Sequence, residues 1–273
     1  MSEDTASTLV DAHVHLHRID CVSSALDAAA RNFISLGGLS PDSGRGVLLL
    51  TQSSGEQVFE NLATSTAIGK WEIRHSNDEP HSLLASDGTH VLAIICGRQV
   101  RTIEGLEVHC LGTLREFPDG MSLAEALESM HDSVGLTVIP WGLGKWTGRR
   151  LEVLQSMLNW VEPAAVFLGD NGGRLGLIDP PPLLSGAERR GFRILPGSDP
   201  FPILGDVERI GSFGFRAEIG LSDRDPWRVL RDWLKSRQSS PLPYGRPMAL
   251  GRFLLNQGGI RVYQRYLRLR GTG

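Results

Sequence analysis

Few cysteines, no excess of positive charge and no long apolar run characterise this sequence. Its 273 residues include three cysteines without paired spacing, which argues against a disulfide framework and suits a reducing cytoplasm. The net charge of −3 gives no electrostatic reason to expect nucleic-acid binding. No apolar run reaches membrane-spanning length and no secretory leader opens the chain, so we expect a soluble, cytoplasmic protein with no membrane partner.

Short apolar runs alternate with helical patterns along the chain. The runs 47–51, 136–139, 165–168 and 192–195 predict buried parallel strands, while 23–36, 56–64 and 122–131 carry helical stripes. Hydrophobic residues make up 41% of the chain, which is enough for a sizeable core in one large domain or two small ones. About seven strands, mostly separated by helices, predict an α/β fold: a parallel (β/α)7 barrel of the TIM type.

Two segments interrupt this pattern. Asp87-Gly88 is a strong hairpin signal, so we expect 70–100 to form a small antiparallel β-hairpin insertion in a barrel that spans 1–236. Serine and proline in 237–248 predict a linker, and 237–273 as a whole is expected to end in a helical tail that packs on the barrel. The arginines of that tail leave contact with a nucleic acid or a membrane surface as the alternative.

The stretch 9–17 alternates apolar and polar residues with the period of a β-strand. Its apolar positions are Val10, Ala12, Val14 and Leu16, and its polar positions are Asp11, His13, His15 and His17. A strand would place the polar set on one face, with alternate residues roughly 7 Å apart. Imidazoles at that spacing can bind one metal ion or two neighbouring ones, whereas a solvent-facing strand more often carries Lys, Glu or Thr. We therefore expect a metal site here.

Further polar residues follow other predicted strands. They are Glu107, His109, Asp170 and Asp199. The chemistry of parallel barrels lies where the strands run into the next loops, and these residues all fall there.

A basic, glycine-rich loop at 140–150 leads into a helix. It carries Lys145 and Arg149, and a second glycine-rich turn ends in Arg174. Glycines let the backbone approach a ligand, and the free N–H groups of a helix start favour anions. We expect these residues to bind an anionic substrate, most simply a phosphate ester, although the glycines would equally serve as plain turns.

The motifs Asp11-Ala-His13-Val-His15, Gly105-Leu106-Glu107 and Gly197-Ser198-Asp199 resemble successive motifs of the polymerase and histidinol phosphatase (PHP) family. The resemblance spans roughly residues 9–220. It implies a distorted seven-stranded barrel that holds up to three divalent metals, which activate water for phosphoester hydrolysis. The first motif is specific, and the other two are short.

Three imidazoles of the family pattern are missing from this chain. Thr51-Gln52 stands where a histidine follows the second strand, Pro140-Trp141 replaces a His-Pro, and Asp199-Pro200-Phe201 replaces an Asp-x-His. The remaining ligands implied by the resemblance are His13, His15, Glu107 and Asp199. That set suits one or two divalent ions, such as zinc, manganese or iron, rather than three.

The leading hypothesis is accordingly a metal-dependent phosphoesterase acting on a small phosphorylated molecule. Lys145, with Arg149 or Arg174, would bind the phosphate, and Asp170 or His109 would orient a ligand or act as general base. Two other hypotheses remain open. One is an amidohydrolase-type hydrolase, and the other is an inactive barrel that binds a phosphorylated ligand or a protein partner.

Overall fold

The computed structural model describes residues 7–248, apart from 40–43, 132, 143, 176–178, 180 and 204. The arginine-rich tail beyond residue 248 lies outside the described residues. No described helix is long and apolar enough to span a bilayer.

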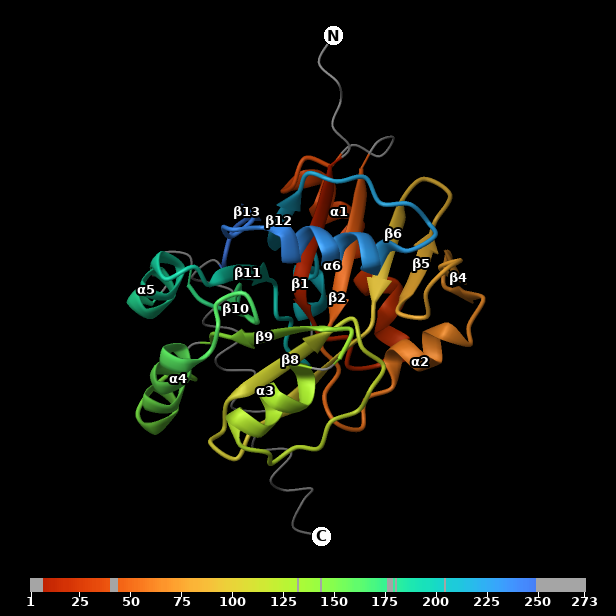
Figure 1. Ribbon diagram of the computed structural model, residues 1–273. Helices are drawn as coiled ribbons and strands as arrows, with labels where there is room; N and C mark the ends of the chain where they lie inside the picture. The colour runs from red at the N-terminus through yellow and green to blue at the C-terminus, as the bar shows by residue number, and fades with distance from the viewer. Residues whose placement is uncertain are drawn as a thin grey trace.

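Two mixed β-sheets form the centre of the structure (Figure 1). The eight-stranded sheet runs in the order β13 (Leu242–Gly245), β12 (Phe213–Ala217), β1 (Thr8–Val14), β2 (Arg45–Leu50), β6 (Val91–Ile95), β5 (Ser82–Ser86), β4 (Trp71–His75) and β3 (Ala67–Ile68). The five-stranded sheet runs in the order β11 (Arg193–Gly197), β10 (Val166–Asn171), β9 (Leu136–Pro140), β8 (Glu107–Leu111) and β7 (Gly97–Arg101).

Six α-helices flank these sheets in the described chain. They are α1 (Val22–Ser35), α2 (Val58–Ala63), α3 (Leu123–His131), α4 (Arg149–Trp160), α5 (Pro182–Arg189) and α6 (Pro226–Ser236). Two short 3-10 helices, η1 (Ile19–Cys21) and η2 (Asp206–Arg209), lie in loops.

The predicted (β/α)7 TIM-like barrel is wrong. The pairs β1–β2, β2–β6, β9–β10 and β10–β11 are parallel, but the other ladders are antiparallel. No ladder joins the two sheets into a closed barrel within the described chain. Apolar runs identify buried strands without identifying their neighbours, and here hairpins connect several strands that a barrel would separate by helices.

The segment 70–100 was also assigned to the wrong part of the fold. The expected hairpin at Asp87-Gly88 forms, because β5 and β6 pair antiparallel on either side of it. However, β6 also pairs in parallel with β2, so the hairpin belongs to the main sheet and is not an insertion. Likewise, the predicted linker 237–248 contains β13, which pairs with β12.

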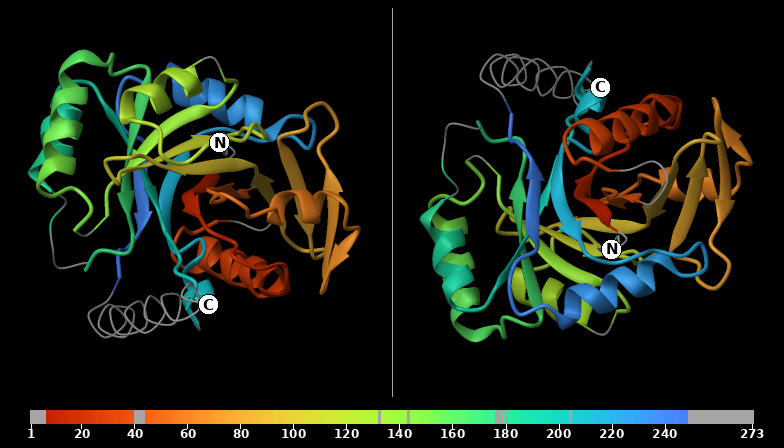
Figure 2. Two further views of the ribbon diagram at one scale, coloured as in Figure 1. Left: turned by 90° about the horizontal axis from the view of Figure 1, so that it is seen from below. Right: turned by 90° about the horizontal axis from the view of Figure 1, so that it is seen from above.

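Three apolar clusters hold the layers together. The first packs α1 and α2 on one face of the eight-stranded sheet, and the second packs α3, α4 and α5 on the outer face of the five-stranded sheet. The third lies between the two sheets and includes residues of α6, so that α6 and α1 lie on opposite faces of the eight-stranded sheet (Figures 1 and 2). The candidate site lies where β1 meets the five-stranded sheet.

A bulge in β1 determines which side chains reach that site. Asp11 pairs with Leu48, and Val14 pairs with Leu50. Three residue steps along β1 therefore match two along β2, which means that β1 contains one extra residue. One extra residue reverses which face the following side chains occupy. Val14 therefore packs in the α1 cluster, whereas Ala12 packs between the sheets. The predicted strict alternation of 9–17 is wrong at this point.

Candidate metal centre

His13 and His15 lie side by side at the end of β1. Their Nε2 atoms are 3.2 Å apart and both side chains are buried. The ring centroids are 5.1 Å apart with tilted planes. The bulge before Val14 gives both imidazoles a common direction and leaves Asp11 on the other face.

Asp199 joins the two histidines from the far end of the chain. At Gly197 the backbone of β11 approaches β1 so closely that an added Cβ would lie 2.4 Å from His13 N. Two residues later Asp199 N donates to His13 O at 2.9 Å. The carboxylate Oδ1 of Asp199 then lies 3.4 Å from His13 Nε2 and 3.8 Å from His15 Nε2. Asn171 at the end of β10 donates to the other carboxylate oxygen.

These three ligand atoms have the separations that a small divalent ion requires. All lie within 4.8 Å of one another, and all three residues are buried. With metal–ligand bonds of about 2.0–2.2 Å, neighbouring ligand atoms of a tetrahedral site lie roughly 3.3–3.6 Å apart. The observed separations of 3.2, 3.4 and 3.8 Å bracket that range.

Protonation also suits metal binding. Burial lowers the pKa of His13 to about 3, against the opposing charge of Asp199, and burial likewise lowers the pKa of His15. Burial alone would raise the pKa of Asp199, but His13, Lys145 and His15 outweigh it and hold that pKa below its usual range. The site thus offers neutral imidazoles and an ionised carboxylate, which are the ligand forms of these groups.

A second potential ligand set shares His15. His15, His17 and Glu56 also bring ligand atoms within 4.8 Å of one another. The His17 ring stacks on His15 with a centroid distance of 5.3 Å, and its nitrogens lie 3.2 Å from Glu56 Oε1 and 3.2 Å from Pro200 O. His15 Nδ1 is buried and has no hydrogen-bond partner, so the imidazole has an uncommitted nitrogen.

His109 extends the cluster from the facing sheet. Its ring meets His13 edge-on, with centroids 4.3 Å apart. His109 Nε2 donates to Gln99 Oε1 at 2.9 Å, and Nδ1 is buried without a partner. Burial and the neighbouring histidines hold the pKa of His109 well below its usual value. Because Nε2 carries the proton, Nδ1 has a free lone pair.

Lys145 and Glu107 form an ion pair beside the imidazoles. Burial alone would lower the pKa of Lys145, but Glu107 and Asp199 raise it above its usual value, so the amine is a cation. Glu107 belongs to neither of the two ligand sets and instead accepts a hydrogen bond from Lys145. Its role as a metal ligand remains a prediction.

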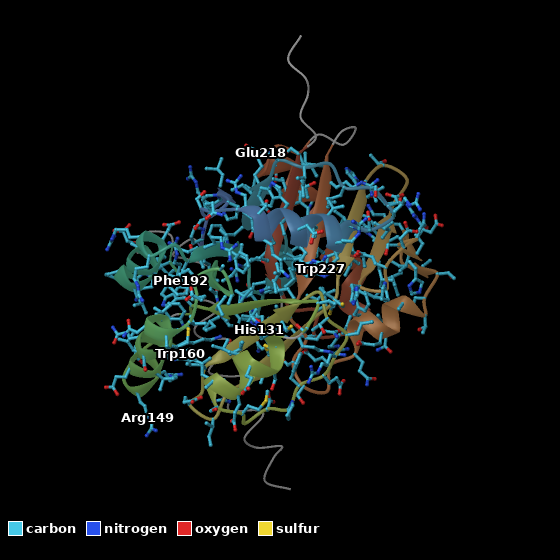
Figure 3. The ribbon with its side chains drawn as sticks, viewed as in Figure 1. His131, Arg149, Trp160, Phe192, Glu218 and Trp227 are labelled. Atoms are coloured by element: carbon cyan, nitrogen blue, oxygen red, sulfur yellow. The ribbon has the colours of Figure 1, made fainter. Side chains whose placement is uncertain are left out.

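The other predicted site residues lie elsewhere. Asp170 and Arg174 form a buried pair with two hydrogen bonds of 3.0 Å. Arg149 begins α4, is exposed, and extends away from the sheets (Figure 3). The structure therefore brings together His13, His15, Asp199, His109, Lys145 and Glu107. Catalytic or phosphate-binding roles for Asp170, Arg149 and Arg174 stay predictions from the sequence.

Four residues that sequence reasoning did not assign to the site support it. Glu56 lies in the loop after the parallel strand β2, which is a place where metal ligands are expected. The residues around it form no recognisable ligand motif, so the sequence did not single it out. Asp170 and Asn171 are neighbours in β10, so their side chains lie on opposite faces of the sheet. The carboxylate of Asp170 was selected from the sequence, but it is the amide of Asn171 that contacts Asp199. Buried Arg209 donates to Asp199 O at 3.2 Å and to Ser198 O. Gln99 orients His109.

Asp11 connects the strand to the loop that carries Asp199. Its carboxylate accepts hydrogen bonds of 2.8 Å from Ser198 N and of 2.8 Å from Gly211 N. Burial raises the pKa of Asp11 to about 6, although these hydrogen bonds lower it. Asp11 thus positions Asp199 and is not a ligand in either set.

No protein-family model matches this chain, and no curated protein matches it. Among solved structures, the chain is similar to PsfC from Pseudomonas syringae PB-5123, with a TM-score of 0.53. The two are 16% identical over 96% of this chain and 99% of that chain. At this identity the likeness concerns the fold alone.

Proposed function

We propose that this protein is a metal-dependent hydrolase that acts on a small phosphorylated molecule, in the manner of the PHP family that its motifs resemble. The observation that carries the proposal is the convergence of His13, His15 and Asp199, whose buried ligand atoms have the spacing of a divalent metal site. Neutral imidazoles combined with a carboxylate suit zinc, manganese or iron. The second set, with His17 and Glu56, would hold another ion and share His15.

A bound divalent metal supplies Lewis acidity, which activates water near neutral pH and offsets the charge that develops on a phosphoryl oxygen. The protein contributes the rest of the environment. Asn171 fixes the Asp199 carboxylate through a hydrogen bond, and Gln99 fixes the tautomer of His109. His109 Nδ1 then has a free lone pair beside the ligands, which can accept a hydrogen bond from the attacking water and orient it.

Lys145 provides the positive charge of the site. Its amine is a cation close enough to His13 and Asp199 to influence the pKa values of both. Glu107 holds the amine in place and shares its charge. An incoming phosphate would take over part of that interaction, so that Lys145 binds the substrate and stabilises the more highly charged transition state.

Metal content together with phosphatase activity tests the proposal. Protein purified without added metal should contain about one equivalent or more of zinc, manganese or iron, and should release phosphate from phosphomonoesters. His13→Ala should lower metal affinity by at least about 100-fold. His131→Ala is the matched control, because His131 is the exposed last residue of α3 (Figure 3). Less than about half an equivalent of metal, with no activity after metal addition, would refute the proposal.

A non-catalytic ligand-binding protein is the second candidate. One observation favours it: Lys145 is a cation held in place by Glu107 beside the imidazoles, so the protein's own side chains supply a positive group that can bind an anion. This alternative predicts that metal-free protein binds inorganic phosphate with the same affinity as metal-treated protein. Calorimetric titration of both forms separates the two candidates.

A further inference from the structure

An apolar cavity opens directly beside the metal-ligand sets. It has a volume of about 290 Å³ and lies between the segment that follows β1 and the loop that follows β11. Its walls include His15, Leu16, His17, Phe201, Ile203 and Val207. Two of these residues, His15 and His17, also belong to the ligand sets, so the cavity and the candidate metal centre share a wall.

Apart from His15 Nδ1, which is buried without a partner, the imidazole and guanidinium groups of this wall already have polar neighbours. Both nitrogens of His17 lie 3.2 Å from protein oxygens, Nδ1 from Glu56 Oε1 and Nε2 from Pro200 O. Arg18 also lines the cavity, and its guanidinium is bonded to the Asp20 carboxylate. A sugar or another hydroxyl-rich group would lose its hydrogen bonds with water here and gain few in return. An apolar group would gain from burial against Leu16, Phe201 and Ile203.

We propose that this cavity binds an apolar group of about phenyl size on the substrate whose phosphate lies at the metal centre. This inference rests on the proposed function and narrows its substrate class to phosphate esters of aryl-substituted alcohols. An apolar cavity of about 150 Å³ holds benzene, so one of about 290 Å³ takes a phenyl ring with a short alkyl linker. The linker then connects the ring to the phosphate at the shared wall.

Equilibrium binding of two non-hydrolysable probes tests the proposal. Isothermal titration of metal-loaded protein with 2-phenylethylphosphonate and with ethylphosphonate should show about 10–100-fold tighter binding of the phenyl compound. Its heat capacity change should be more negative, because apolar surface is buried. Equal affinity for the two probes would overturn the proposal. So would tighter binding of 2,3-dihydroxypropylphosphonate than of 2-phenylethylphosphonate.

Matched variants locate the effect. Ile203→Asp places a carboxylate in the apolar wall and should abolish the advantage of the phenyl probe. Ile103→Asp makes the same change at a side chain that is 75% exposed outside the cavity, and should retain the advantage. Val207→Thr replaces a methyl group of the wall with a hydroxyl at nearly the same volume, and should reduce the affinity advantage of the phenyl probe. It replaces Ile203→Asp as the test if that variant fails to fold. An advantage that survives in both Ile203→Asp and Val207→Thr would contradict the assignment.

A further probe separates failure of this inference from failure of the proposed function. 2-Phenylethanol carries no phosphate, so its binding to metal-free protein measures the cavity alone. Binding that Ile203→Asp removes, in a protein without phosphatase activity, would keep the cavity assignment and refute the hydrolase. Conversely, equal kcat/KM values for 2-phenylethyl phosphate and ethyl phosphate, whose scissile bonds are alike, would keep the hydrolase and refute the apolar subsite.

Discussion

Asp199 combines an uncommon backbone conformation with a side chain of the candidate metal centre. Its φ is 47°, and it is the one non-glycine residue of the described chain with positive φ. Aspartate and asparagine are among the non-glycine residues that adopt this region most readily. The conformation lets the backbone N–H of Asp199 bond to His13 O while the carboxylate faces both imidazoles. A residue keeps such an uncommon φ when the contacts around it hold the backbone in place.

Asp199→Asn therefore separates charge from conformation. Asparagine tolerates the same φ, so the fold should persist, while the loss of the carboxylate charge should weaken zinc binding by at least about 100-fold. Competition with a chromophoric chelator measures the dissociation constant. Asp232→Asn, at a carboxylate that is 54% exposed on α6, should leave it unchanged. Equal zinc affinity in the wild type and Asp199→Asn would remove Asp199 from the ligand set.

At the residue scale, the sequence allowed part of the centre to be found. His13, His15 and Asp199 were selected because imidazoles at alternate positions and a carboxylate after a strand are typical of metal ligands. Asp11 was placed with them, but the bulge before Val14 turns it to the opposite face. A bulge depends on pairing with another strand, and a single strand's sequence does not reveal it.

The contact between β1 and β11 is the element-scale feature on which the centre depends. No hydrogen-bonded ladder joins these strands in the described residues, and the close approach instead needs the missing side chain of Gly197. The neighbouring atoms are His13 N and Cα, which belong to backbone and so cannot move aside as a flexible side chain would.

Gly197→Ala should consequently separate the two strands. We expect a loss of about 1–3 kcal/mol in the free energy of unfolding, together with weaker metal binding. Gly186→Ala is the control, because its added Cβ meets nothing nearer than 3.9 Å in α5. That change should be neutral or stabilise by about 0.5–1 kcal/mol. Urea unfolding measures both, and wild-type stability and zinc affinity in Gly197→Ala would contradict this account of the contact.

The turn between β5 and β6 carries a stabilising charge. Burial alone would raise the pKa of Asp87, but hydrogen bonds from the His90 backbone, Lys70 and the Thr89 backbone hold that pKa below its usual range. The folded pKa lies below the unfolded value of about 3.9, so the stabilisation is present above that pH and is lost as the pH falls below it.

Asp87→Asn should accordingly have a pH-dependent cost. At pH 7 we expect the substitution to lower the free energy of unfolding by about 1–2 kcal/mol, since charge-assisted hydrogen bonds become neutral ones. At pH 3 the carboxyl of the unfolded wild-type chain is largely protonated while the folded one is still ionised, so the unfolded state gains stability and the difference between the two proteins should shrink. Urea unfolding at both pH values measures it. A difference that stays constant would show that the charge has no part in the turn.

Element boundaries were more predictable than element partners. The predicted helix 122–131 appears as α3, and the predicted strand 136–139 appears as β9. Both follow from local periodicity, which the sequence displays directly. Strand order depends on pairings across the chain, such as β1 with β12, and nothing within 9–17 or 213–217 specifies that pairing. The barrel prediction failed because it required a strand order that local patterns do not specify.

The apolar cluster between the sheets couples the two halves of the molecule. It joins Val47 and Leu49 of the eight-stranded sheet to Val138 and Phe167 of the five-stranded sheet. Because neither sheet can keep this face dry without the other, we expect both to open in one cooperative transition.

Hydrogen exchange of Phe167→Ala tests this coupling. Phe167 is 1% exposed, so its truncation should cost about 3–5 kcal/mol. The free energy of opening should fall by the same amount for amides of β2 and of β9, although Phe167 belongs to β10. Leu114→Ala, at a side chain that is 38% exposed, should change neither. A decrease confined to β9 and its neighbours would show that the sheets open separately.

The hydrogen bonds of Asp11 have a consequence for the order of folding. They join it to Ser198 and Gly211, which are 187 and 200 positions further along the chain. Closing loops of that length carries a large entropic cost that only nearly complete tertiary structure offsets. During synthesis His13 and His15 therefore leave the ribosome long before Asp199 and the residues that anchor it, Ser198 and Gly211. The nascent chain thus has no assembled candidate centre, and any metal ion that the centre binds would enter only after the chain has folded.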